Sequence, residues 1–153
     1  MNEHPSKIPP ISVMVLGYGG LVPFIALSAV EWVVPAHADV LHHALLAYAA
    51  VILSFVGALH WGFAMLAGAW QPRGRTMGYA WSVVPSLVAW VALLVPSPFG
   101  AGLLVAFFIA HYARDVRVAP VIKAPDWFLP LRWRLSVIAV LSITAGEMAL
   151  RRI

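Results

Sequence analysis

The sequence predicts an all-α, polytopic membrane protein, a bundle of about five transmembrane helices with the N-terminus inside. Hydrophobic residues make up 62% of the 153 residues, charged residues make up 10%, and the mean hydropathy is +0.88. A soluble domain of this size carries far more charge. The chain also alternates long apolar runs with short polar breaks, and about 20 residues cross a bilayer. Residues 1–153 therefore form a single integral membrane domain, with no room for a soluble catalytic domain.

The first two helices are predicted at residues 11–34 and 40–70. A glycine-rich stretch and Pro23 interrupt the first, so it should pack closely and kink near the proline. The second would be about 45 Å long at 1.5 Å per residue, which exceeds the ~30 Å hydrocarbon core. It must tilt or reach beyond the membrane, with its His42 and His43 end in the interface.

Three more helices are predicted at residues 77–95, 99–118 and 131–150. Pro96 and Pro98 force a tight turn between the first two of these, because proline cannot continue a helix. The last has a short apolar middle, so it should tilt little or rely on snorkelling arginines at its ends.

The basic residues orient the bundle. With the N-terminus inside, Arg151 and Arg152 lie outside, and the inner side carries Lys7, Arg73, Arg75, Arg114, Arg117, Lys123, Arg132 and Arg134. The positive-inside rule favours this orientation, with the C-terminus outside. The net charge of +4 therefore indicates contact with lipid headgroups rather than with nucleic acid.

Several classes of chemistry are excluded or unsupported. The chain has no cysteine, which excludes disulfides, thiolate metal sites, iron–sulfur clusters and covalent c-type haem. No nucleophile elbow, phosphate loop or pair of catalytic carboxylates is visible. We therefore predict no catalytic residue and no metal ligand, although an enzyme is not excluded.

Polar groups within the helices are the candidate functional residues. His60 lies in the middle of the second helix, where an ionisable group is costly and often functional. It would contact a ligand, a proton or a haem, or it would be a neutral histidine bonded to a neighbouring helix, which we favour. His111 and Asp115 are four residues apart and face one side of a helix, but two ligands do not make a metal site. We interpret this run as a charged helix end.

A second polar group is expected at the outer side. It comprises Glu31, His37, Asp39, His42, His43 and Glu147. Imidazoles and carboxylates together hold zinc or copper, or relay protons. No spacing motif links these residues, and acidic residues belong in outer loops by topology alone. We therefore favour the interpretation that this group reflects topology and not a binding site.

Four stretches carry a resemblance to a known family. They are LGYGGLVPF (16–24), AYAAVILSFVGALHWG (47–62), YAWSVVPSLVAW (79–90) and WFLPLRWRL (127–135). The chain resembles the bacterial domain-of-unknown-function membrane family related to mitochondrial transmembrane protein 69. The resemblance implies a small multi-pass protein of the bacterial inner (cytoplasmic) membrane, with no established activity. The residues inside its motifs are His60, Trp61, Trp81, Ser82, Pro85, Arg132 and Arg134.

The favoured function is a non-enzymatic accessory or assembly factor for a larger inner-membrane complex. The small size and the lack of a catalytic constellation support it. So does a face of the second helix on which small residues recur every four positions, which lets another helix approach closely. These residues are Ala50, Ser54, Ala58 and Gly62.

The alternative function is the binding or carriage of a hydrophobic cofactor or lipid, such as haem or a quinone. Such ligands need large apolar pockets with few polar groups. The pocket would lie in the inner half of the bundle, with His60 as its polar group and Trp61 and Trp81 as walls. Ser82 lies somewhat shallower than His60, as does Trp81, and Arg132 and Arg134 would stand at the mouth. The identity of the cofactor stays open.

Overall fold

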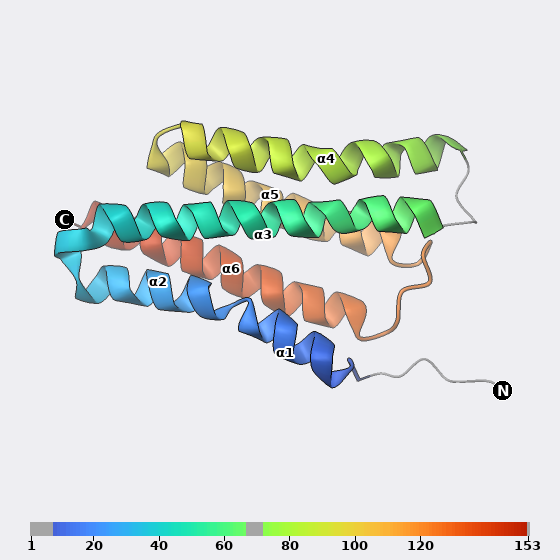
Figure 1. The fold of residues 1–153 in the computed structure, drawn as a ribbon, viewed down its shortest axis with the longest axis horizontal. Coiled ribbons are helices and arrows are strands. Elements are labelled where there is room, and N and C mark those ends of the chain that lie inside the picture. Colours follow the sequence, from blue (N-terminus) through green and yellow to red (C-terminus); the bar gives the residue numbers. More distant parts are fainter. Residues whose placement is uncertain (1–7, 67–71, 153) are drawn as a thin grey trace.

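The computed structural model describes residues 8–66 and 72–152, and this part is helical without a β-strand (Figure 1). Its elements are α1 (Ile11–Gly19), α2 (Val22–Val33), the 3-10 turn η1 (Pro35–His37), α3 (Ala38–Leu66), α4 (Pro72–Leu94), α5 (Ser97–Val118) and α6 (Phe128–Arg151). Five helical stretches, with α1 and α2 counted together, are long and apolar enough to cross a membrane. The predicted all-α bundle of five spanning helices is confirmed.

The helix boundaries differ from the prediction by a few residues, most at the start of α4, and the first helix is divided near Pro23, where a kink was predicted. The first helix breaks at Gly20 and Leu21, just before Pro23, and the hydroxyl of Tyr48 on α3 donates to the freed Gly20 carbonyl at 2.9 Å. In an apolar environment, such a freed carbonyl needs a partner. Helix α4 begins at Pro72 rather than at residue 77, because proline fits the first turn of a helix. Residues 67–70 of the predicted second helix lie outside the described residues.

Successive long helices run in opposite directions, so Ile11 and Arg151 lie at opposite ends of the bundle (Figure 1). We call the end where α3 ends and α4 and α6 begin the basic end. Among the described residues it carries Arg73, Arg75, Arg114, Arg117, Lys123, Arg132 and Arg134. The opposite end carries Arg151 and Arg152. Which end faces inward stays a prediction from charge.

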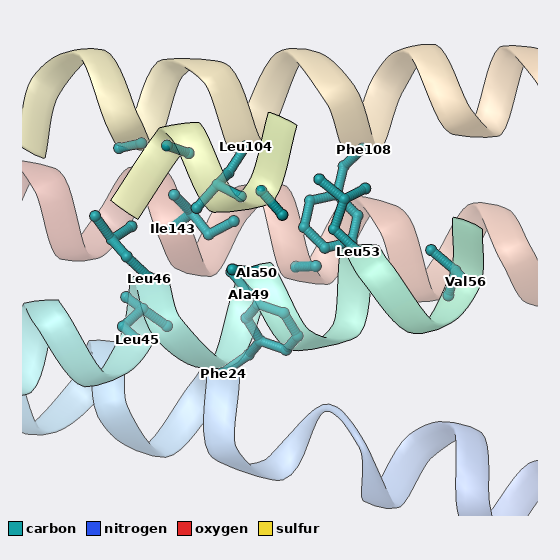
Figure 2. Close-up of a cluster of buried hydrophobic side chains, with 14 of the residues drawn as sticks. Phe24, Leu45, Leu46, Ala49, Ala50, Leu53, Val56, Leu104, Phe108 and Ile143 are labelled. Atoms are coloured by element: carbon teal, nitrogen blue, oxygen red, sulfur yellow. The ribbon is translucent and has the colours of Figure 1, made fainter. Parts of the chain in front are cut away.

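Helix α3 is the central element and contacts α2, α4, α5 and α6. Its buried face supplies Leu45 and Leu53, which meet Leu104 of α5 and Ile143 of α6 in an apolar core (Figure 2). Phe24 of α2 closes the core, with its ring steeply inclined to those of Tyr48 and Phe108. Large apolar residues on the outer faces are exposed, as expected for lipid contact.

Helices α3 and α4 pack closely at Gly57. A Cβ atom added at Gly57 would lie 2.9 Å from Cβ and Cγ of Pro85 and 3.3 Å from the carbonyl oxygen of Ser82. Pro85 is buried, and α4 continues through it as one helix. The absence of a side chain at Gly57 therefore lets the proline-bearing turn of α4 pack against α3.

Gly57→Ala should destabilise the fold, because the added methyl group overlaps Pro85. We expect a loss of ~1–3 kcal/mol of unfolding free energy, the usual effect of overpacking. Thermal unfolding of the purified protein in mild detergent measures it. The matched control is Gly62→Ala on the same helix, where an added Cβ meets no atom within 4 Å. Equal melting temperatures for the two variants would contradict the close approach.

Candidate functional site

Asp115, in the last turn of α5, is the centre of a buried polar cluster at the basic end. Its side chain is 2% exposed. Its Oδ1 accepts a hydrogen bond from Nε2 of His60 at 2.9 Å, and its Oδ2 accepts one from Nε of Arg132 at 2.7 Å. His60 comes from α3 and Arg132 from the start of α6. One carboxylate thus joins three helices.

Trp81 of α4 and His111 of α5 extend this cluster. The indole Nε1–H of Trp81 donates to Nδ1 of His111 at 3.3 Å, and the two rings are nearly parallel, 13° apart. An indole nitrogen only donates, so Nδ1 of His111 is an acceptor and a neutral ring carries its proton on Nε2. That nitrogen lies 3.8 Å from Oδ1 of Asp115. The arrangement links α4 to the carboxylate through His111.

The side chains of His60, His111 and Asp115 are close enough to share a cation, since one ligand atom from each lies within 4.8 Å of the others. Nδ1 of His60 and Nε2 of His111 are buried without a hydrogen-bond partner among the described residues. Two contacts oppose a metal there. Arg132 already neutralises the carboxylate, and the bond from Trp81 puts the proton of His111 on the nitrogen that would bind the ion. The contacts favour a buried ion-pair network.

The structure brings together only some of the residues that were predicted to form one pocket. His60, Trp81 and Arg132 meet in the Asp115 cluster. Trp61 lies on the exposed side of α3, with its ring 4.9 Å from that of Tyr79. Ser82 and Arg134 form hydrogen bonds outside the cluster. Ser82 donates to the Tyr79 carbonyl, and Arg134 donates to the Tyr18 hydroxyl.

His111 and Asp115 belong to the cluster, although the sequence suggested a charged helix end. Their spacing of four residues was the available signal, since it puts both on one side of α5. The sequence does not show whether that side of α5 faces the bundle interior or the surroundings. Arg114, next to Asp115, instead lies near the ring of Trp81, 5.9 Å from its centroid.

A groove runs beside the cluster, between α1, α3 and α6 near the basic end. Its volume is about 600 Å³. The lining is almost entirely apolar and includes Leu16, Gly17, Phe55, Leu59, Trp127 and Leu135. Arg132 and Ser136 of α6 are its polar side chains, and no histidine, aspartate or glutamate of residues 8–66 and 72–152 lines it. Arg132 therefore belongs both to the groove and to the Asp115 cluster.

A second buried polar cluster lies at the opposite end. Nδ1 of His42 is hydrogen-bonded to Oε2 of Glu31 at 3.2 Å, and Nε2 of His42 lies 3.2 Å from Oε2 of Glu147. The second contact is at ion-pair distance but lacks the angle of a hydrogen bond. Glu147 also accepts hydrogen bonds from Ser97 and Arg151, both at 2.8 Å. This cluster ties α2, α3 and α6 together.

The remaining residues of the predicted outer group do not join this cluster. His37, Asp39 and His43 are exposed. His42 and Glu31, by contrast, are 2% and 0% exposed. Burial therefore separates one half of the predicted group from the other.

The two clusters are separated by an apolar layer. His42 and His60 are 18 residues apart on α3, which is five turns and about 27 Å, so both face the bundle interior. Between them the buried face of α3 is formed by Leu45, Ala49 and Leu53, none of them measurably exposed. An apolar core of this kind favours structural and binding roles for the clusters over conduction of protons between them.

Comparison with known proteins identifies the family of the chain and two relatives. Residues 9–148 match a family described as "Protein of unknown function (DUF3429)". The chain belongs to the DUF3429 family. It is 32% identical over 140 residues to Transmembrane protein 69 of Xenopus tropicalis, which covers 92% of this chain and 55% of that protein. It is 25% identical over 133 residues to Transmembrane protein 69 of Mus musculus, covering 87% and 54%.

The chain thus spans about half the length of these two relatives. No solved structure matches it. The DUF3429 membership, the relatives and the five candidate spans together show a multi-pass membrane protein, in agreement with the family resemblance found in the sequence.

Asp115→Asn should strongly destabilise the protein, because it leaves Arg132 without a counter-charge in a largely buried site. Breaking one partner of a buried pair costs about 3–5 kcal/mol. Thermal or denaturant unfolding in detergent measures it, with Asp126→Asn, an exposed position before α6, as the control. The double variant with Arg132→Gln should recover part of the loss. Strict additivity of the two substitutions would contradict the ion pair.

Proposed function

We propose that this protein is a non-catalytic membrane protein that binds a hydrophobic, amphipathic molecule of the bilayer in the groove between α1, α3 and α6. One observation carries the proposal. The groove of about 600 Å³ is apolar over nearly all of its lining, and among the described residues its one cation is Arg132. Binding sites for small hydrophobic ligands have this composition, with a few polar groups that set orientation.

The lining favours a lipid or a quinone over haem. Haem iron needs an axial ligand such as histidine, and the part of the chain that the structure describes places none in the groove. His60 does not line the groove. It donates to Asp115, which in turn holds Arg132. In this proposal His60 and Trp81 position Arg132 through the cluster, and Arg132 meets the ligand.

We also propose that the protein lies in a bacterial inner (cytoplasmic) membrane with the basic end inward. The lysines and arginines of the described residues support this orientation, because seven lie at the basic end and two, Arg151 and Arg152, at the other. The groove would then open near the cytoplasmic leaflet.

Gly17→Phe should abolish ligand binding, because the aromatic ring would project from α1 into the groove. A Cβ at Gly17 meets only the Leu135 side chain, at 3.4 Å, so the fold should tolerate it. Mass spectrometry of molecules that co-purify with the protein in mild detergent measures the loss. Gly19→Phe, on the same short helix but outside the groove lining, is the control. A Gly17→Phe protein that retains its bound molecules would refute the groove as their site.

An accessory role in a larger membrane complex is the second candidate, and a free surface on α3 supports it. Ala58 is exposed, and a Cβ at Gly62 would meet no atom of the described residues within 4 Å. Helix α4 packs on the neighbouring face, at Gly57. A helix of another protein would therefore find small residues at which its backbone approaches closely.

Gly62→Trp should then release partner proteins by blocking that approach. Affinity purification in mild detergent, followed by native electrophoresis, measures the loss of a larger complex. Leu141→Trp is the control, since Leu141 is exposed on α6, away from this surface. If the wild-type protein migrates alone under conditions that preserve membrane complexes, or if both variants lose their partners equally, the accessory role is wrong.

A further inference from the structure

We infer that the groove takes a phospholipid whose headgroup carries a net negative charge. This inference rests on the proposed function, that the groove binds an amphiphile of the bilayer. It adds the chemical class of the headgroup and the residues that receive it, Arg132 and Arg134. The arguments are the donors that these arginines leave free, the balance of charge at the rim, and the depth of the site.

Arg132 retains donors for a second anion. A guanidinium offers five N–H groups, and the bond between Arg132 and Asp115 uses Nε. The terminal amino groups form no further hydrogen bond to the described residues, and they belong to a residue that lines the groove. Their planar fork matches two oxygens of a phosphate. Arg132 can therefore bridge Asp115 on one side and a phosphate on the other.

Arg134 supplies a positive charge that no carboxylate of the described residues neutralises. It is exposed, and its recorded bond is to the neutral hydroxyl of Tyr18 at 3.4 Å. Tyr18 and Arg134 are the sequence neighbours of Gly17 and Leu135, which both line the groove. Asp115 balances Arg132, so among the described residues the charge of Arg134 at the rim stays uncompensated. A neutral quinone would leave this charge unmatched, and the cationic headgroup of a zwitterionic lipid would be repelled by it.

The depth of the arginine fits a headgroup. Arg132 is four residues from the start of α6 at Phe128, or about 6 Å along the helix, and Trp127 stands at the same end of the groove. Tryptophan is typical of the membrane interface. A phosphate at Arg132 would therefore lie at headgroup level, with its acyl chains along Leu16, Phe55 and Leu59.

The test is native mass spectrometry of the full chain in mild detergent. The probes are dioctanoyl phosphatidylglycerol, dioctanoyl phosphatidylcholine, a short-chain ubiquinone, and glycerol 3-phosphate as the head without chains. We expect the phosphatidylglycerol to bind about fivefold more tightly than the phosphatidylcholine, and glycerol 3-phosphate not to bind. Near a membrane surface, one lysine or arginine changes the affinity for an anionic lipid about fivefold.

Arg134→Gln should therefore reduce binding of the phosphatidylglycerol about fivefold and leave the phosphatidylcholine unchanged. Arg132→Lys keeps the charge but loses the planar fork, so it should weaken the same lipid selectively. Arg152→Gln, at the opposite end, is the control and should change neither affinity.

The outcomes separate the two claims. Equal affinities for the two phospholipids, preferential binding of the quinone, or an Arg134→Gln protein that keeps the preference would overturn the anionic headgroup while the groove remains a binding site. Binding of glycerol 3-phosphate alone would replace the lipid by a soluble phosphate. Failure of every probe to bind, or binding that Gly17→Phe does not affect, would overturn the proposed function itself.

Discussion

The buried carboxylate of Asp115 is the interaction on which the basic end of the bundle depends. An unpaired charge in an apolar interior is costly, so it must be neutralised and hydrogen-bonded where it lies. Its partners come from elsewhere in the chain, His60 on α3 and Arg132 on α6. The three helices must therefore keep one relative position along the bundle for the three side chains to meet. His111 and the indole of Trp81 bring α4 into the same arrangement, so four helices are aligned by one acidic group.

This alignment also shapes the groove. Arg132 is held by Asp115 at one edge of its guanidinium, which directs a cation into an otherwise apolar lining. Helix α1 covers the groove from the other side and has no buried residue of its own. Among the described residues, two side-chain hydrogen bonds hold α1 to the other helices. One is the long bond between Tyr18 and Arg134, and the other runs from Tyr48 to the Gly20 carbonyl just after α1. Elements with so few buried contacts open most easily, so α1 is the helix at which the proposed ligand would enter the groove.

Much of this fold could be predicted from the sequence, and the site only in part. The apolar runs located the five spans, since helix length and bilayer thickness constrain each other. The contacts of Asp115 could not be predicted, because its partners are 55 and 17 residues away in the chain. Trp61 shows the limit most clearly. It adjoins His60 in the sequence, yet about 100° of helical rotation puts it on the exposed side of α3. Neighbours in a motif need not share a site.

The two polar clusters make α3 and α6 the fixed frame of the bundle. Helices α3 and α6 contribute to both, through His42 and Glu147 at one end and through His60 and Arg132 at the other. The apolar core between them excludes slippage, because a shift of one helix would break both clusters and unpack Leu45 and Ile143 together. Helix α1 belongs to neither cluster. It can therefore move without exposing a buried charge, so in the proposed function a ligand would enter the groove between this helix and the α3–α6 frame while the rest of the protein keeps its structure.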